Sequence, residues 1–471
     1  MDAITKFFTD VLAPVINTGP IVLIFIIFTI IGIIVRLKVI DAFRNGLMIA
    51  VGFSGVYLIV DYFLSNVGPV AGKLAQKFAG GFAYTDVGWA PFSGIAWGAP
   101  VAFMVVGIAI IVNLIMIFLN MTDTLNLNFW DYWHAILGTA IVVFITGNLL
   151  AGIIFAILCI WLSLMFADWY ANLGHVKYFG FQNISFYQGC MGIWGVIGEG
   201  LARVMNLIPF LRKSNVTSES IQERFGAIGE PAVLGAIIGF LMGLAAGLPL
   251  DQLLIFTLEV AAALVLLPRM TGIVMEAIVP VMDAAAAFMQ KRVKGRALYI
   301  GVDPAIAVGN TTAMTVTIIM MPILIFLNLV LPFAKAIPIA DNVGLIFVFI
   351  YLVAPMKGDL LKTLISALII SIIGIFSSIV AAPILTQIAI AQGVSIPAGA
   401  SGITSWAVHM DLETFLSWAA TRNYVFPNLI GIAVLTVIVI GFSAYLRIRF
   451  VQKRKGGLQL ESEPKPVDPE N

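Results

Sequence analysis

The chain has 471 residues, a formal net charge of +1, 61% apolar residues and only 11% charged residues. Soluble domains carry about 25% charged residues, and a chain this apolar could not cover a soluble surface with polar groups. The composition therefore excludes soluble enzymes, nucleic-acid binders and disordered proteins, and it indicates a polytopic membrane protein.

Apolar stretches long enough to cross a bilayer recur along the chain. A transmembrane helix needs about 20 mostly apolar residues. We expect about eleven spans, near residues 16–36, 45–64, 98–119, 132–147, 149–167, 228–247, 251–268, 312–332, 342–356, 360–382 and 426–446. The charged tail 451–471 is expected to be a disordered cytoplasmic end.

The Lys and Arg residues predict the orientation. With eleven spans and the N-terminus outside, all of the 26 basic residues lie in cytoplasmic segments except Lys6, Lys73, Lys77, Lys335 and Arg422. Basic residues concentrate on the cytoplasmic side of membrane proteins. The C-terminus is therefore predicted to be cytoplasmic.

Short motifs repeat at one spacing. Pro20-Ile21-Val22-Leu23 is matched by Pro231-Ala232-Val233-Leu234, and Gly147-Asn148-Leu149-Leu150 by Gly358-Asp359-Leu360-Leu361. Both pairs are 211 residues apart (20 to 231 and 147 to 358). Five spans in each half predict two inverted repeats, an architecture typical of transporters. The expected division is residues 1–225 (first repeat and cytoplasmic connection), 226–424 (second repeat), 425–450 (final helix) and 451–471 (tail).

Four further segments are not expected to cross the membrane. Residues 67–79 and 278–292 are amphipathic and predict interfacial helices, whereas 184–200 and 396–412 predict re-entrant pieces. The predicted fold is thus an all-α polytopic membrane protein with two inverted five-helix repeats plus amphipathic and re-entrant segments.

Two aspartates occupy comparable positions in the two halves. One lies in Thr85-Asp86-Val87-Gly88-Trp89 and the other in Gly301-Val302-Asp303-Pro304. Ionisable groups at membrane depth suggest a functional site, and a carboxylate can accept hydrogen bonds from two sugar hydroxyls. The alternative is that these aspartates only cap broken helices.

Other polar residues are candidates for substrate contact. His134 is one of three histidines, although it could equally serve an interhelical hydrogen bond. Gln188 and Asn310 are amides in broken stretches and offer both donors and acceptors. Glu230 precedes Pro231, a pair that also suits an ordinary helix start. The predicted substrate-binding set is Thr85, Asp86, His134, Gln188, Glu230, Asp303 and Asn310. Tryptophans that could stack on a sugar, or simply lie at the membrane interface, are Trp89, Trp97, Trp194 and Trp406.

The sequence lacks the motifs of several common kinds of enzyme chemistry. The sequence contains no phosphate-binding P-loop, no zinc-like Cys/His spacing and no GxSxG nucleophile motif. Cys159 and Cys190 are expected to be small buried hydrophobic residues. No catalytic residue, metal or cofactor is predicted for this chain.

In combination, several motifs resemble the galactitol-type IIC permeases, the membrane subunits of a bacterial phosphoenolpyruvate-dependent sugar phosphotransferase system. The motifs are Thr85-Asp86-Val87-Gly88-Trp89, Trp133-His134, Phe225-Gly226-Ala227-Ile228-Gly229-Glu230-Pro231, Leu267-Pro268-Arg269 and Ile300-Gly301-Val302-Asp303-Pro304-Ala305. The resemblance covers roughly residues 10 to 450.

The resemblance implies a homodimeric permease in the bacterial inner membrane. It implies that a sugar or polyol crosses by an elevator-like motion and is phosphorylated at the cytoplasmic side by a separate IIB subunit, itself supplied by IIA. Two positions depart from the family pattern, because amides stand where histidines are expected, at Asn310 and in the stretch with Gln182 and Asn183. These departures bear on which sugar or polyol fits.

Two rival functions remain. An ion-coupled secondary transporter would use the two aspartates as proton or sodium sites, and it would draw on a membrane gradient rather than on phosphoenolpyruvate. An intramembrane enzyme would need a nucleophile or a metal cluster at membrane depth.

Overall fold

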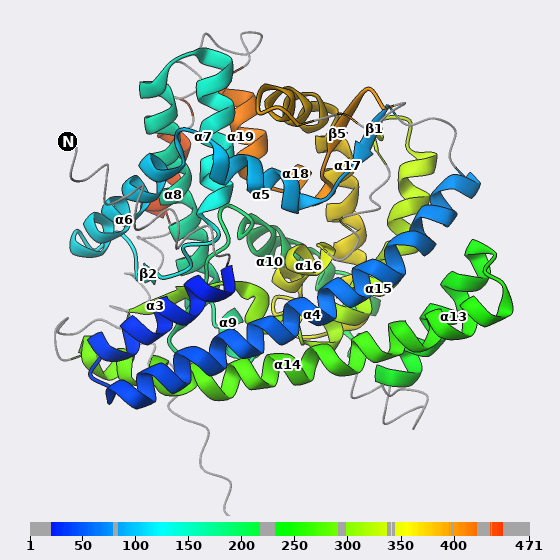
Figure 1. Ribbon diagram of the computed structural model, residues 1–471, viewed down its shortest axis with the longest axis horizontal. Helices are drawn as coiled ribbons and strands as arrows, with labels where there is room; N and C mark the ends of the chain where they lie inside the picture. The colour runs from blue at the N-terminus through cyan, green and yellow to red at the C-terminus, as the bar shows by residue number, and fades with distance from the viewer. Residues whose placement is uncertain are drawn as a thin grey trace, which may run out of the picture.

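The computed structural model describes residues 20–78, 83–216, 231–290, 298–336, 341, 344–394, 396, 400–421, 434 and 436–445. This part of the chain is mostly helical, which confirms the predicted helical membrane class. Two layers of helices are visible in Figure 1. One holds long helical hairpins, and the other holds shorter helices and strands around the candidate site.

The long layer consists of two hairpins. Its helices are α3 (Pro20–Ile34), α4 (Val39–Phe78), α13 (Pro231–Ala246) and α14 (Leu250–Gln290). Helix α4 packs along α14 (Figure 1). Gly52 allows a close approach, since a Cβ there would lie 2.8 Å from the backbone nitrogen of Val274. Small residues at such contacts let membrane helices pack tightly.

The two expected interfacial helices do not exist as separate elements. Residues 67–78 are the end of the 40-residue helix α4, and residues 278–290 are the end of the 41-residue helix α14. Each long helix measures about 60 Å at about 1.5 Å per residue. The expected break was wrong because no turn intervenes. The Asn66 side chain donates to the Tyr62 carbonyl four residues earlier, and α4 continues through Pro69.

The second layer contains the remaining helices. They are α5 (Trp89–Gly98), α6 (Ala102–Phe118), α7 (Tyr132–Thr146), α8 (Leu149–Asn172), α9 (His175–Tyr178), α10 (Ile193–Met205), α11 (Pro209–Arg212), η3 (Pro304–Ala307), α15 (Thr311–Val330), α16 (Leu345–Val353), α17 (Leu360–Ala391), α18 (Trp406–His409) and α19 (Leu412–Thr421).

Three of the described helices, α8, α15 and α17, are long and apolar enough to cross a membrane, and α5 with α6 forms a fourth candidate bent by 90°. The expected span at 342–356 is instead the nine-residue helix α16, about 14 Å long. This helix is too short to cross alone, and Gly344 and Ala354 flank it inside the protein. The count of eleven spans stays a prediction.

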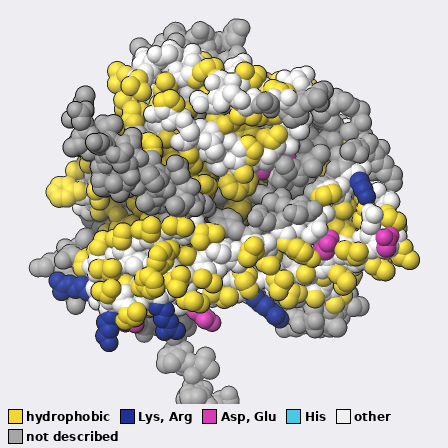
Figure 2. Space-filling view, viewed as in Figure 1, with side chains coloured by type: hydrophobic (Ala, Val, Ile, Leu, Met, Phe, Trp, Pro, Cys, Tyr) yellow, Lys and Arg dark blue, Asp and Glu magenta, His cyan; other side chains and the backbone are white. Residues whose placement is uncertain are grey.

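Apolar side chains cover much of the outer surface (Figure 2). On α6, Leu114 and Ile115 are about half exposed and Phe118 is 87% exposed. Continuous exposed apolar surface marks a contact with partners or with lipid. Basic side chains gather at the lower left in Figure 2, over the α3–α4 turn, where Arg36 and Lys38 are exposed.

Five short strands qualify the all-α prediction. They are β1 (Tyr84–Asp86), β2 (Thr124–Asn126), β3 (Ile184–Phe186), β4 (Tyr299–Val302) and β5 (Gly402–Thr404). They form two parallel sheets, β1-β5 and β2-β4-β3. Buried backbone groups need hydrogen-bond partners. The non-helical segments between helices therefore pair with one another as short strands. The segments 184–200 and 396–412 each contain such a strand followed by a helix. Their re-entrant course stays a prediction.

Candidate functional site

The carboxyl ends of three parallel strands converge on one place. Strand β4 ends at Val302 and is followed by Asp303, and strand β3 is followed by Tyr187 and Gln188. The chain after β2 leads to Asn128, whose side-chain nitrogen donates to the Tyr187 carbonyl at 2.8 Å. Because parallel strands end at the same edge of a sheet, this arrangement delivers polar side chains from distant segments to one site.

The second sheet supplies the opposite side. Strands β1 and β5 lead into Trp89 and Ala407. One carboxylate holds both segments, since Asp341 accepts from the backbone nitrogens of Trp89 at 2.9 Å and Ala407 at 3.0 Å. The site therefore lies between the ends of two small sheets.

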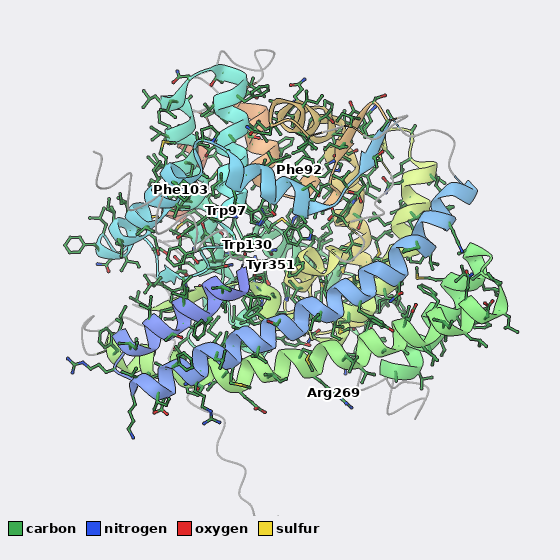
Figure 3. All side chains as sticks on the ribbon, in the orientation of Figure 1. Phe92, Trp97, Phe103, Trp130, Arg269 and Tyr351 are labelled. Carbon is green, nitrogen blue, oxygen red and sulfur yellow. The ribbon has the colours of Figure 1, made fainter. Side chains whose placement is uncertain are left out.

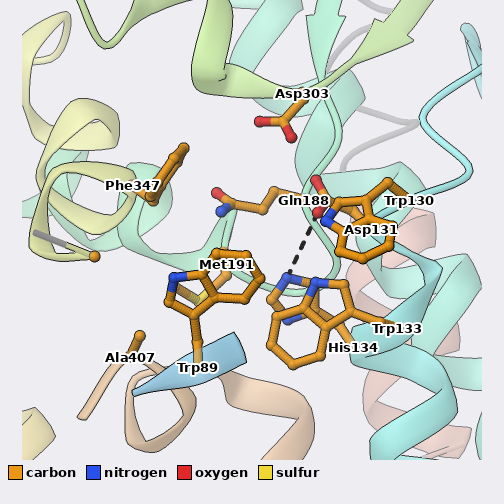
Figure 4. A pocket seen from close by; sticks show the side chains of 11 residues that line it. Trp89, Trp130, Asp131, Trp133, His134, Gln188, Met191, Asp303, Phe347 and Ala407 are labelled. Atoms are coloured by element: carbon orange, nitrogen blue, oxygen red, sulfur yellow. Dashed lines mark ion pairs between the residues drawn. The ribbon is translucent and has the colours of Figure 1, made fainter. Parts of the chain in front are cut away.

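A partly open cavity lies between these ends. Its lining residues are Trp89, Trp130, Asp131, Trp133, His134, Gln188, Met191, Asp303, Gly344, Phe347 and Ala407. Asp303 faces Trp89 and Ala407 across the cavity, with Gln188 between them (Figure 4).

The polar groups of the lining include both carboxylate acceptors and indole N–H donors. Asp303 Oδ1 accepts from the Ala305 backbone nitrogen at 2.7 Å, and Asp131 Oδ2 accepts from Asn128 at 2.5 Å. Gln188 Oε1 and His134 Nε2 are buried and have no hydrogen-bond partner among the described residues. No Lys or Arg lines the described part of this cavity. The lining thus favours an uncharged ligand that can both donate and accept hydrogen bonds.

Aromatic rings form the apolar part. Trp133 stacks on His134 with ring centroids 3.8 Å apart, and Trp89 stacks on Trp133 at 6.1 Å. Trp97 and Trp130 make a second stack, with ring centroids 6.0 Å apart, and lie near one another in Figure 3. Arg269, also labelled there, points outward from α14 and away from these rings. Indole faces beside carboxylates suit a ligand with C–H faces and hydroxyl edges, as sugars and polyols have.

A second cavity adjoins the first and shares Trp130 and Asp303 with it. Its empty volume is about 450 Å³. The wall combines residues of α3, α4 and α14, such as Phe28, Phe53 and Ile278, with residues around the strand ends. This mostly apolar cavity separates the long hairpins from the site.

Three of the predicted substrate-binding residues, His134, Gln188 and Asp303, line the same cavity. Asp303 also caps η3, so its predicted capping role is confirmed. Asn310 does not line the cavity. Its side chain caps α15 by accepting from the Ala313 backbone nitrogen at 3.1 Å. Glu230 lies outside the described residues.

Asp86 and Thr85 are placed elsewhere. The Asp86 carboxylate accepts from the backbone nitrogens of Asp341 at 3.0 Å and Trp406 at 3.1 Å. Thr85 lies in β1, in register with Ile403, and is not among the cavity-lining residues. This favours the alternative weighed for Asp86, in which the carboxylate satisfies buried amides.

Sequence reasoning missed Asp131, Trp130 and Asp411. The first two stand in the run Trp130-Asp131-Tyr132-Trp133-His134, where an acid lies three residues before a histidine at a helix start. That spacing could have drawn attention to Asp131. Nothing local pointed to Asp411, which is 277 residues from His134 in the sequence.

Two buried groups of side chains have metal-ligand atoms close together. Their atoms lie within 4.8 Å in each group, and the groups are Cys159, Cys190 and Glu413, and His134, Asp411 and Glu413. Internal hydrogen bonds account for much of this clustering, since Ser163 Oγ lies 3.4 Å from Cys190 Sγ and donates to Glu413 Oε1 at 3.3 Å. Both cysteines are buried free thiols, as predicted.

These features define a membrane-embedded helical protein with a cavity lined by polar and aromatic side chains, which is the class of carriers for small polar solutes. Residues 14–399 match the family model described as the sugar-specific permease component of the phosphotransferase system (PTS). The chain therefore belongs to this family of PTS permeases and is an integral inner-membrane transport subunit, as the resemblance implied.

Two relatives from Escherichia coli (strain K12) are similar to the chain over most of its length. One, named "Putative permease IIC component", is 30% identical over 435 residues, which cover 92% of this chain and 98% of the relative. The other is the galactitol-specific EIIC component of the PTS. It is 28% identical over 386 residues, which cover 82% of this chain and 85% of the relative.

Proposed function

We propose that this chain translocates a galactitol-like polyol or sugar, and that a separate IIB subunit, supplied by IIA, phosphorylates the substrate on the cytoplasmic side. The observation that carries the proposal is the cavity that Asp131, His134, Gln188 and Asp303 line together with tryptophan side chains. Carboxylate and amide oxygens accept hydroxyl hydrogen bonds, and the lining offers no described cation for an acidic substrate.

We propose that substrate binding involves His134, Gln188 and Asp303 of the predicted set, joined by Asp131. His134 Nε2 and Gln188 Oε1 support this assignment, because each is a buried polar atom at the cavity without a partner in the described structure. Such atoms are costly unless a ligand or water satisfies them.

An elevator-type movement is part of the proposal. In this scheme the long hairpins form a scaffold and the layer that holds the cavity moves against them. The mostly apolar cavity between α3, α4, α14 and the strand ends supports such a boundary, since few polar contacts there would have to break. A homodimer built on the scaffold, an outside N-terminus and a cytoplasmic C-terminus belong to the same proposal.

Inverted repeats would generate this arrangement. The starts of two helix pairs support them, since α4 and α14, and α8 and α17, each begin 211 residues apart (39 to 250 and 149 to 360). This is the spacing of the sequence motifs. The proposed repeats comprise five helices each.

Uptake into vesicles tests the proposal. Vesicles that contain the protein would be given galactitol and a panel of sugars, with and without phosphoenolpyruvate and the soluble phosphotransfer proteins. Uptake that needs the phosphate supply and delivers a phosphorylated product is expected. Uptake of unmodified substrate driven by a proton or sodium gradient would favour the ion-coupled transporter instead.

A further inference from the structure

His134 forms a dyad with a carboxylate behind the cavity. Its Nδ1 lies 2.5 Å from Asp411 Oδ2, and both side chains are buried. Its Nε2 is on the other side of the ring, buried and without a hydrogen-bond partner in the described structure. Asp131 is the nearest acid to that nitrogen, at 4.0 Å (dashed line in Figure 4).

The surroundings of Asp411 determine which nitrogen carries the proton. Asp411 Oδ1 accepts from the Glu413 backbone nitrogen at 3.1 Å, which fixes the carboxylate next to the ring. An ionised carboxylate only accepts hydrogen bonds, so Nδ1 must be the protonated nitrogen of a neutral imidazole. The Nε2 lone pair is then available to the cavity, which His134 lines.

The ring is also held in place. Trp133 stacks on it with centroids 3.8 Å apart, and Gly189 approaches so closely that an added Cβ would lie 2.7 Å from His134 Cβ. An imidazole that is oriented by a carboxylate on one nitrogen and has no described partner on the other is the arrangement of a general base.

We propose that His134 accepts the proton of the substrate hydroxyl that is phosphorylated, and that Asp411 is its positioning residue; this inference rests on the proposed function. In the step, the hydroxyl oxygen forms a bond to phosphorus as the bond between phosphorus and the donor side chain of IIB breaks. The electron pair of the broken bond returns to the donor, and the hydroxyl proton moves to His134 Nε2. The imidazolium later releases the proton to water.

The other acids of the site are less suited to this role. Asp303 Oδ1 and Asp131 Oδ2 already accept hydrogen bonds from Ala305 and Asn128. The permease would thus contribute a catalytic group to the phosphoryl transfer, although the phosphoryl group itself stays on other chains until it reaches the substrate.

The Asp411→Asn variant tests the dyad, because substrate binding and the rate of phosphorylation can be measured separately in it. The asparagine keeps Oδ1 for the Glu413 nitrogen but presents an NH₂ group to Nδ1, which turns Nε2 into a donor. With purified protein in liposomes, we would measure the Kd for galactitol and the single-turnover rate of phosphorylation by a phosphorylated galactitol-type IIB. We expect a Kd within about threefold of the parent and a rate lower by about a hundredfold.

Two further variants and a control complete the design. His134→Asn is expected to lose at least as much rate, and the double variant is expected to lose no more than His134→Asn alone, because the two residues act as a unit. The matched control is Asp359→Asn, another buried carboxylate that caps α17 by accepting from the Lys362 nitrogen. It should retain the parent Kd and rate.

Three outcomes would overturn the dyad. The first is an Asp411→Asn protein with weaker binding and an unchanged single-turnover rate. The second is a loss of rate in Asp131→Asn that matches His134→Asn while Asp411→Asn stays active, which would make Asp131 the base. The third is a parent protein that binds galactitol while the bound galactitol is never phosphorylated, which would remove the proposed function together with the dyad.

Discussion

Gly189 lies where a single methyl group would disturb the site without removing any of its polar atoms. Its φ of 49° is in the left-handed region, and a Cβ there would lie 2.7 Å from His134 Cβ and 2.9 Å from His134 Cγ. Ordinary contact begins near 3.4 Å, so the base of the His134 side chain must move by about 0.7 Å in Gly189→Ala. The backbone conformation adds about 1–2 kcal/mol of strain.

A shift of this size acts on the chemistry more than on the fold. A misplacement of about 1 Å can cost about a hundredfold in rate, so we expect Gly189→Ala to lower phosphorylation-coupled galactitol uptake by between about tenfold and a hundredfold. The assay is initial uptake into vesicles with the complete phosphate supply, normalised to the amount of inserted protein.

Gly180→Ala is the matched control. Gly180 lies before β3, the strand that Gly189 follows. Its φ is 86°, but nothing lies within 4 Å of its Cβ position. It carries the backbone strain alone, and its uptake should stay close to that of the parent. Equal losses in the two variants would refute the reasoning, because they would show that strain, and not displacement of His134, lowers the activity.

Three further predictions concern binding and stability. Asp86→Ala should lower the melting temperature in detergent, since two buried backbone amides lose their acceptor at about 1–3 kcal/mol each; an unchanged temperature would contradict its bracing role. Asp303→Asn should strengthen the binding of galactitol phosphate relative to galactitol by about tenfold or more, because the variant removes a repelling carboxylate beside Asp131. Tenfold corresponds to about 1.4 kcal/mol of discrimination between the two ligands. An unchanged ratio of the two affinities would refute this. Gly52→Leu should destabilise the protein by about 1–3 kcal/mol through overpacking against Val274, whereas Gly272→Leu, with nothing within 4 Å of its Cβ position, should not.

Part of the site was predictable because it depends on local patterns. Asp303 follows a short apolar strand and precedes a proline, and His134 begins an apolar helix, so each stands out as a rare polar group in its surroundings. Asp86 stands out for the same reason, yet its carboxylate binds the backbone of two other segments. A sequence reports that a buried charge needs partners, but not whether these partners are amides or a ligand.

The helices show the same division. Hydropathy predicted the apolar stretches, because burial in lipid or protein acts on every residue of a helix. It did not predict that α4 and α14 continue beyond the expected spans, since Pro69 favours a break and the packing of α4 against α14 is not visible in the sequence.

The sequence by itself determined the membrane class, the family and the residues from which a polar site is built, since composition, hydropathy and motifs are properties of the chain alone. Only the tertiary structure decided that Asp131, Gln188 and Asp303 meet at the ends of three parallel strands and that Asp411 pairs with His134. The physical reason is that hydrogen bonds between residues 277 positions apart leave no periodic trace in the sequence, and they form only when strand pairing brings the ends of distant segments together.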